Sequence, residues 1–116
     1  MRANQKFRSV IFYKNYFQNF FAVQNPKIKS KIIWTFELIE QVDKVPETYL
    51  KHIESTNGLY EIRVQHGSNI FRIFCFFDDR RLVIIANGFQ KKTNKTPKSE
   101  IAIALSIKTE YENNQS

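Results

Sequence analysis

The chain has 116 residues, of which 42% are hydrophobic, so it is long enough for one domain with a modest core and too apolar for a disordered polymer. Eighteen Lys and Arg against eleven Asp and Glu give a net charge of +7, which favours a polyanionic partner, above all nucleic acid. A single cysteine excludes an intramolecular disulfide, and no run approaches the roughly 20 apolar residues of a membrane helix. We therefore expect one domain over 1–116 in the cytoplasm, with no membrane contact.

The N-terminal part of the chain predicts one strand and two helices. Residues 7–13 are rich in aromatic and β-branched types and predict a strand, and 16–23 predict a short helix. Residues 27–42 predict an amphipathic helix, because apolar side chains recur at helical spacing and charged ones lie off that stripe. The apolar stripe consists of Ile28, Ile32, Phe36 and Ile39.

The rest of the chain predicts three strands and a last helix. Short turns between the strands imply antiparallel hairpins, so the strands form a meander. The order of elements predicts an α+β fold with its helices on one face of a curved sheet, leaving the other face partly open. The predicted ranges are a connection at 43–58, strands at 59–66, 69–77 and 81–87, a basic loop at 88–96, a helix from about 97 to 112 and a flexible tail at 113–116.

Arg72 is unusual, because it lies within the apolar run 70–77. A charge in such a strand needs a partner or a groove that reaches solvent. Two interpretations stay open and do not exclude each other. Arg72 forms an ion pair with Glu61 or Asp78, or it forms a cationic floor for phosphate with Arg63, which side-chain alternation places beside Glu61 on one face of the preceding strand.

Several segments resemble a RelE/HigB-like branch of phage-derived toxins. The resemblance rests on GLYEIRV at 58–64, FRIF at 71–74 and GFQKKTNKTP at 88–97, and 100–104 is similar to the start of that branch's final helix. It implies the small RelE-like fold and the toxin of a type II toxin–antitoxin system. Such toxins are mRNA endonucleases, also called mRNA interferases, that usually act on translating ribosomes. The implied partners are mRNA and a helix-turn-helix antitoxin encoded beside the toxin.

The chemistry of RNA cleavage suits the charged residues of these segments. RNA breaks when its 2′-hydroxyl attacks the neighbouring phosphate, so a catalyst orients that attack, stabilises phosphoryl charge and moves protons, and it needs no metal or cofactor. Arg63 and Arg72 are the candidate phosphate clamps, Lys91 adds charge or carries a proton, and Glu61 is a base or only their ion-pair partner. The candidate RNA contacts are Lys92, Lys95, Lys98 and the ring of Phe74.

Other reactive side chains predict no site of their own. Cys75 lies in an apolar strand and reads as a core residue. Tyr111 continues an apolar helical stripe, which favours packing over catalysis, and His66 lies in a turn next to a glycine. With only His52 in addition, these residues make no zinc site.

Three alternative functions remain open. One is a ParE-like toxin that acts on gyrase without catalysis, although such toxins lack a basic catalytic cluster. Another is a nucleic-acid-binding module that uses the phenylalanines of the central strand for stacking. The last is an inactive relic that only holds an antitoxin.

Overall fold

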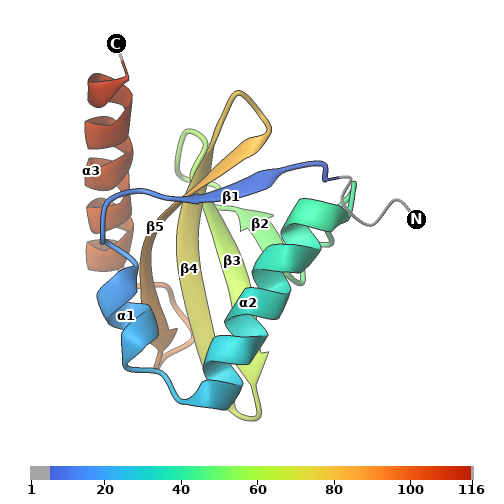
Figure 1. Ribbon diagram of the computed structural model, residues 1–116. Coiled ribbons are helices and arrows are strands. Elements are labelled where there is room, and N and C mark those ends of the chain that lie inside the picture. Colours follow the sequence, from blue (N-terminus) through green and yellow to red (C-terminus); the bar gives the residue numbers. More distant parts are fainter. Residues whose placement is uncertain (1–5, 116) are drawn as a thin grey trace.

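Five strands form one twisted sheet in the order β1-β5-β4-β3-β2 (Figure 1). The computed structural model describes residues 6–115, and both the mixed α+β class and the C-terminal helix expected from the sequence are confirmed. The elements are β1 Ser9–Phe12, α1 Gln18–Ala22, α2 Pro26–Gln41, β2 Leu50–His52, β3 Tyr60–His66, β4 Asn69–Asp78, β5 Leu82–Lys91 and α3 Lys98–Asn114.

The centre of the sheet is the predicted antiparallel meander of β3, β4 and β5. Two edge strands complete it in ways that the sequence pattern did not predict. Strand β1 runs parallel to β5, with Ser9 opposite Leu82, and β2 pairs antiparallel with the start of β3. The expected connection at 43–58 therefore contains a strand of three residues, too short for a visible alternation of polar and apolar side chains.

Strand β5 is longer than expected and takes up part of the predicted basic loop. Its pairing with β4 continues as far as Ile70 opposite Lys91, so Lys91 belongs to the sheet. The register shifts once, between the pairs Ile73–Gly88 and Cys75–Ile85, where β5 carries one extra residue. Such a bulge bends the strand and redirects neighbouring side chains.

The expectation that all helices cover one face is wrong. Helices α1 and α2 lie in front of the sheet in Figure 1, and α3 stands beside β5. The core under α2 contains Phe71 and Ile73 of β4, whereas the core under α3 contains Phe74 and Phe76. Because successive side chains of a strand point to opposite faces, α2 and α3 pack on opposite faces of the sheet.

The local sequence of helix α2 accounts for both its N-terminus and its buried face. Pro26 occupies its first turn, and the Asn25 side chain accepts a hydrogen bond of 2.9 Å from the Ile28 backbone N–H. The predicted stripe is buried throughout, which confirms it: Ile28, Ile32, Phe36 and Ile39 are all at most 7% exposed.

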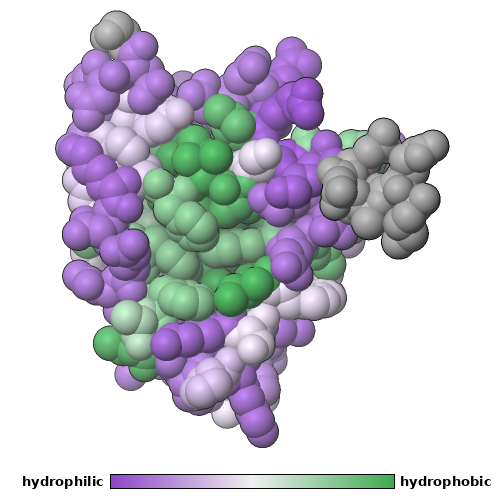
Figure 2. Space-filling model, viewed as in Figure 1, coloured by the Kyte–Doolittle hydropathy of each residue, from purple (hydrophilic) through white to green (hydrophobic). Residues whose placement is uncertain are grey.

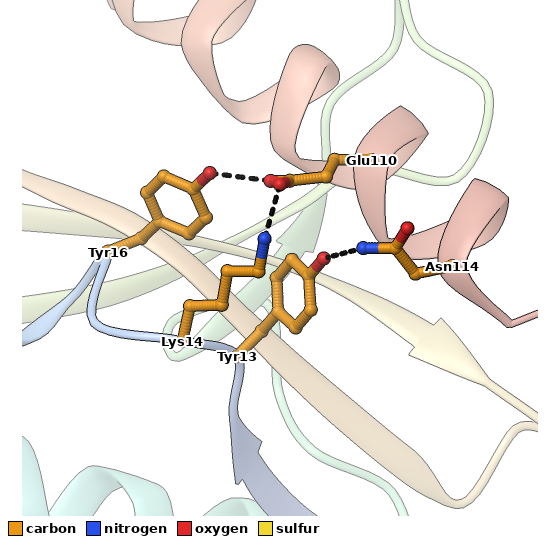
Figure 3. Close-up of polar contacts among 5 residues, drawn as sticks. All are labelled: Tyr13, Lys14, Tyr16, Glu110 and Asn114. Carbon is orange, nitrogen blue, oxygen red and sulfur yellow. Dashed lines mark hydrogen bonds and ion pairs between the residues drawn. The ribbon is translucent and has the colours of Figure 1, made fainter.

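Helix α3 is fastened to the turn after β1 by polar contacts (Figure 3). Glu110 accepts hydrogen bonds of 2.5 Å from both Lys14 Nζ and Tyr16 OH, and Asn114 Nδ2 donates to Tyr13 OH at 2.8 Å. The bond to Lys14, then that to Tyr16, lowers the pKa of Glu110 below its usual range. Because α3 continues to Asn114, the tail expected from residue 113 begins later, and Ser116 lies outside the described residues.

A mostly apolar hollow of about 640 Å³ opens between β1, α1 and α2. Figure 2 shows apolar surface in the middle of this view, between α3 and α2. Phe12 is 53% exposed and Ile33 47% exposed at this hollow, which we call the apolar hollow. Its lining consists of Phe12, Phe17, Gln18, Asn19, Phe21, Ala22, Ile33 and Phe36.

Within residues 6–115, none of the helices combines the length and the apolar character needed to cross a membrane.

Candidate functional site

Arg63 and Arg72 lie opposite each other in the pairing of β3 with β4, so their side chains share one face of the sheet. Both line a hollow of about 410 Å³ at the outer edge of β3, which we call the arginine hollow. Just beyond the residues of β3 that pair with β2, the backbone N–H of Arg63 donates to the Tyr49 carbonyl at 2.8 Å. This bond places the segment before β2 at the wall of the arginine hollow. The lining includes Lys31, Thr48, Tyr49, Arg63, Gln65 and Arg72.

The Arg72 guanidinium is buried and under-used as a hydrogen-bond donor. The residue is only 6% exposed, and its Nη1 donates to the Phe71 carbonyl at 3.1 Å. Its Nε is one of two buried side-chain polar atoms without a hydrogen-bond partner in the described part of the chain. A guanidinium carries five N–H donors, so an anion in the hollow could accept hydrogen bonds that the protein leaves unmade.

Glu61 lies between the two arginines and is 8% exposed. Its carboxylate oxygens are 3.5 Å from Arg63 Nε and 3.8 Å from Arg72 Nε. The sequence left two candidate ion-pair partners for Arg72, Glu61 and Asp78. In the structure the partner is Glu61. Asp78 instead accepts a hydrogen bond of 2.7 Å from Tyr111 OH. Because two arginines share one carboxylate, the three side chains keep a net positive charge and can still attract an anion.

Lys91 is half-buried at the end of β5, opposite Ile70 on the same face as the arginines. Burial lowers its pKa below the usual range of a lysine, and repulsion by Arg72 acts in the same direction, against the attraction of Glu61. The pKa of Arg72 is also lowered, by burial first and then by Arg63. The four catalytic candidates therefore form one electrostatically coupled group.

The RNA-contact candidates do not join this group. Lys92, Lys95 and Lys98 are exposed at the end of β5 and the start of α3, and none of the three lines the arginine hollow. Phe74 is 0% exposed and packs against Phe89 with ring centroids 5.5 Å apart. Stacking on a base needs an accessible ring face, so the expectation for Phe74 is corrected: α3 covers this part of the sheet and makes the residue core.

The sequence did not predict two residues of the arginine hollow that come from distant parts of the chain. Lys31 reaches the arginine hollow from α2, and Tyr49 reaches it from the segment before β2. Nothing in their local sequence marks them. Asn87 carries a weak signal, as a polar residue in an apolar strand. It is buried at the β5 bulge, where its Nδ2 donates to Glu100 Oε1 at 3.1 Å.

Cys75 and Tyr111 lie in the two cores, whereas His66 is exposed at the end of β3. Burial raises the pKa of the Cys75 thiol, as expected for a core cysteine. The hydrogen bond to Asp78, together with burial, raises the pKa of Tyr111 to about 12, and its ring packs between α3 and β4 against Phe76. Over the described residues 6–115, His, Cys, Asp and Glu side chains form no group of three or more that could hold a metal ion.

A known protein family matches most of the chain. The model of the family described as phage-derived protein Gp49-like (DUF891) matches residues 19–109. The chain belongs to this family. The Gp49-like family is part of the RelE/HigB-like toxin superfamily, and membership implies an antitoxin partner. Every residue of the arginine hollow lies inside the Gp49-like match. No curated protein matches the chain.

Proposed function

We propose that this Gp49-like protein is the toxin of a type II toxin–antitoxin pair and that it cleaves mRNA, in the manner of an mRNA interferase on translating ribosomes. The observation that carries the proposal is the buried, under-bonded Arg72 beside Arg63 in an open hollow. A phosphate that enters this hollow meets two guanidinium groups, the geometry that best binds phosphoryl oxygens.

The reaction needs only the RNA and groups that this chain supplies. The 2′-oxygen forms a bond to the adjacent phosphorus as it loses its proton. The bond from phosphorus to the 5′-oxygen breaks as that oxygen gains a proton, which leaves a 2′,3′-cyclic phosphate and a 5′-hydroxyl. Arg63 and Arg72 stabilise the charge that builds up on the phosphoryl oxygens, as preorganised donors do at oxyanion sites.

Two side chains are candidates for the proton transfers. The pKa of Lys91 is lowered, which makes its ammonium a better proton donor to the leaving 5′-oxygen than an ordinary lysine. Glu61 is the candidate base, but both its oxygens face arginines, a placement that suits orienting those arginines equally well. The Glu61→Gln variant separates the two roles, because loss of a base removes the acidic limb of the pH–rate profile.

The direct test is cleavage of a short RNA, with and without ribosomes, followed by analysis of the product ends. Cyclic phosphate and 5′-hydroxyl ends are expected, and a single 2′-deoxy substitution at the cut position should block cleavage. Growth arrest on induction without any RNA cleavage would instead favour a non-catalytic toxin. RNA binding with neither cleavage nor arrest would favour a binding module.

For the antitoxin partner, we propose that an amphipathic, acidic segment docks in the apolar hollow. Its exposed Phe12 and Ile33 are apolar surface of a kind that a soluble protein usually covers with a partner. The chain's net charge of +7 favours an acidic partner. The helix-turn-helix type expected of the antitoxin is tested by co-expressing the neighbouring reading frame and isolating the complex.

A further inference from the structure

Trp34 is the only tryptophan of the chain, and it lies on the surface of α2, 44% exposed. It is not part of the buried stripe of that helix. It makes an edge-to-face contact with Tyr49, with centroids 5.7 Å apart and planes at 67°. The Lys31 ammonium lies over the ring, 4.7 Å from the indole centroid. Two neighbours therefore hold the indole in place, and part of it remains exposed to a ligand.

The hollow beside Trp34 shares Lys31 with the arginine hollow, around the outer edge of β3 from the face that carries Arg63 and Arg72. It has a volume of about 530 Å³, and we call it the tryptophan hollow. Lys31 lines both hollows, and His66 of the tryptophan hollow follows Arg63 on β3 by three residues, roughly 10 Å at strand spacing. The tryptophan hollow is lined by Pro26, Lys27, Ser30, Lys31, Trp34 and His66.

Both hollows carry positive charge. Lys27, Lys31 and Trp34 follow each other at spacings of four and three residues, which places them on one side of α2. Arg63 and Arg72 provide the positive charge of the adjoining hollow. Among residues 6–115, the linings of the two hollows include no Asp or Glu. An aromatic ring set among cations is the arrangement that binds single-stranded nucleic acid, by stacking on a base and attracting its phosphates.

We propose that Trp34 and Lys31 form a subsite for an unpaired base of the RNA strand whose phosphate lies between Arg63 and Arg72. The inference rests on the proposed function and assigns to it a substrate-binding subsite. The base stacks on the indole, and Lys31 contacts the flanking phosphate. The subsite holds the strand next to the reacting phosphate but touches no reacting atom, so its loss weakens substrate binding more than it slows the bond-breaking step.

Fluorescence of the single tryptophan reports on this subsite directly. A 2′-O-methyl RNA of about ten nucleotides, within the range of single-strand site sizes, cannot be cleaved and serves as the probe. Titration of the purified chain should change Trp34 emission in a saturable way. With a labelled probe, Trp34→Ala should weaken binding by about 5- to 100-fold, since loss of a stacking ring costs about 1–3 kcal/mol. Trp34→Phe should retain most of the affinity.

Lysine variants provide a matched control. Lys31→Ala should weaken binding, whereas Lys29→Ala should not, because the Lys29 ammonium stands over the Phe21 ring beside a different hollow. Both variants remove one positive charge from the same helix. A general electrostatic effect would therefore weaken them equally, and that result would overturn the subsite. Thermal unfolding of each variant establishes that it is folded.

The other outcomes separate this inference from the proposed function. If RNA binds and Arg72→Met weakens it, but Trp34→Ala has no effect, the subsite is wrong and the proposed function stands. If the wild-type chain neither binds nor cleaves RNA, free or on ribosomes, both fall. If Trp34→Ala keeps RNA binding and loses the co-expressed antitoxin, the surface is a protein interface, and the subsite is wrong.

Discussion

Replacement of Arg72 by methionine tests the site most directly. Methionine is unbranched and flexible and fills much of the space of the arginine stem, so the change removes the charge with little loss of packing. If Arg72 clamps the reacting phosphate, cleavage should fall by about 10²- to 10³-fold, equivalent to about 3–4 kcal/mol, as on removal of one preorganised donor at an oxyanion site. RNA cleavage by the purified variant and growth arrest on its induction both measure this loss.

The structure also predicts how stable this variant is. Breaking a buried ion pair costs about 3–5 kcal/mol when the remaining charge is stranded. Glu61 is not stranded here, because Arg63 Nε stays 3.5 Å from its carboxylate. The attraction lost is that of the Arg72–Glu61 pair at 3.8 Å, worth about 4 kcal/mol at an effective dielectric constant of about 20. The repulsion between Arg63 and Arg72 is relieved at the same time, and it affects the pKa of Arg72 more than Glu61 does, so the two effects largely cancel. The lost bond to the Phe71 carbonyl leaves a cost of about 2 kcal/mol.

A folded, inactive Arg72→Met is therefore the expected result, with a melting temperature only modestly lowered. Arg72→Lys should restore part of the activity, because it returns the charge without the two-pronged geometry. A fully active Arg72→Met would refute the clamp. A variant that loses activity only in proportion to a large loss of stability would make Arg72 a scaffold residue, as the alternative drawn from the sequence holds.

Three further predictions follow from other parts of the structure. Lys91→Met should raise the melting temperature at neutral pH, because the lowered pKa of Lys91 means that its charge costs stability. The gain should shrink as the pH rises through that lowered pKa into the ordinary lysine range, and a variant that is no more stable at neutral pH would contradict this. Glu110 has a lowered pKa, so its bonds to Lys14 and Tyr16 stabilise the fold above the ordinary glutamate range, and this stability is lost as the pH falls through the lowered pKa. Glu110→Gln should therefore melt earlier than wild type at neutral pH, and the difference should shrink as the pH is lowered. A difference that stays constant on acidification would count against this role of Glu110. Ile33→Asp should weaken copurification with the antitoxin at moderate salt and leave RNA cleavage intact, and an unchanged complex would remove the apolar hollow as the docking surface.

Much of the secondary structure could be predicted because its signals are local. Helix α2 combines a capping asparagine, a first-turn proline and an apolar stripe of period 3.6, all of which the structure contains. The meander follows from short turns between alternating strands. The hypothesis that Arg63 and Arg72 share a face is confirmed by the register of β3 with β4, and alternation along β4 places Cys75 with the core on the other face.

The tertiary structure decided what lies against each of these elements. Alternation says that Phe74 shares a face with Arg72, but whether that face is covered depends on α3, which packs there from the far end of the chain. Likewise, Lys31 comes to lie beside Arg63, and Trp34 beside Tyr49, only because α2 crosses the sheet next to the edge of β3. Periodicity is set by the geometry of a few consecutive peptides, whereas the choice of face, strand partner and neighbouring helix depends on hydrogen bonds and apolar contacts between distant residues. For that reason the local sequence predicted the arginine pair, and the hollow around it emerged only from the fold.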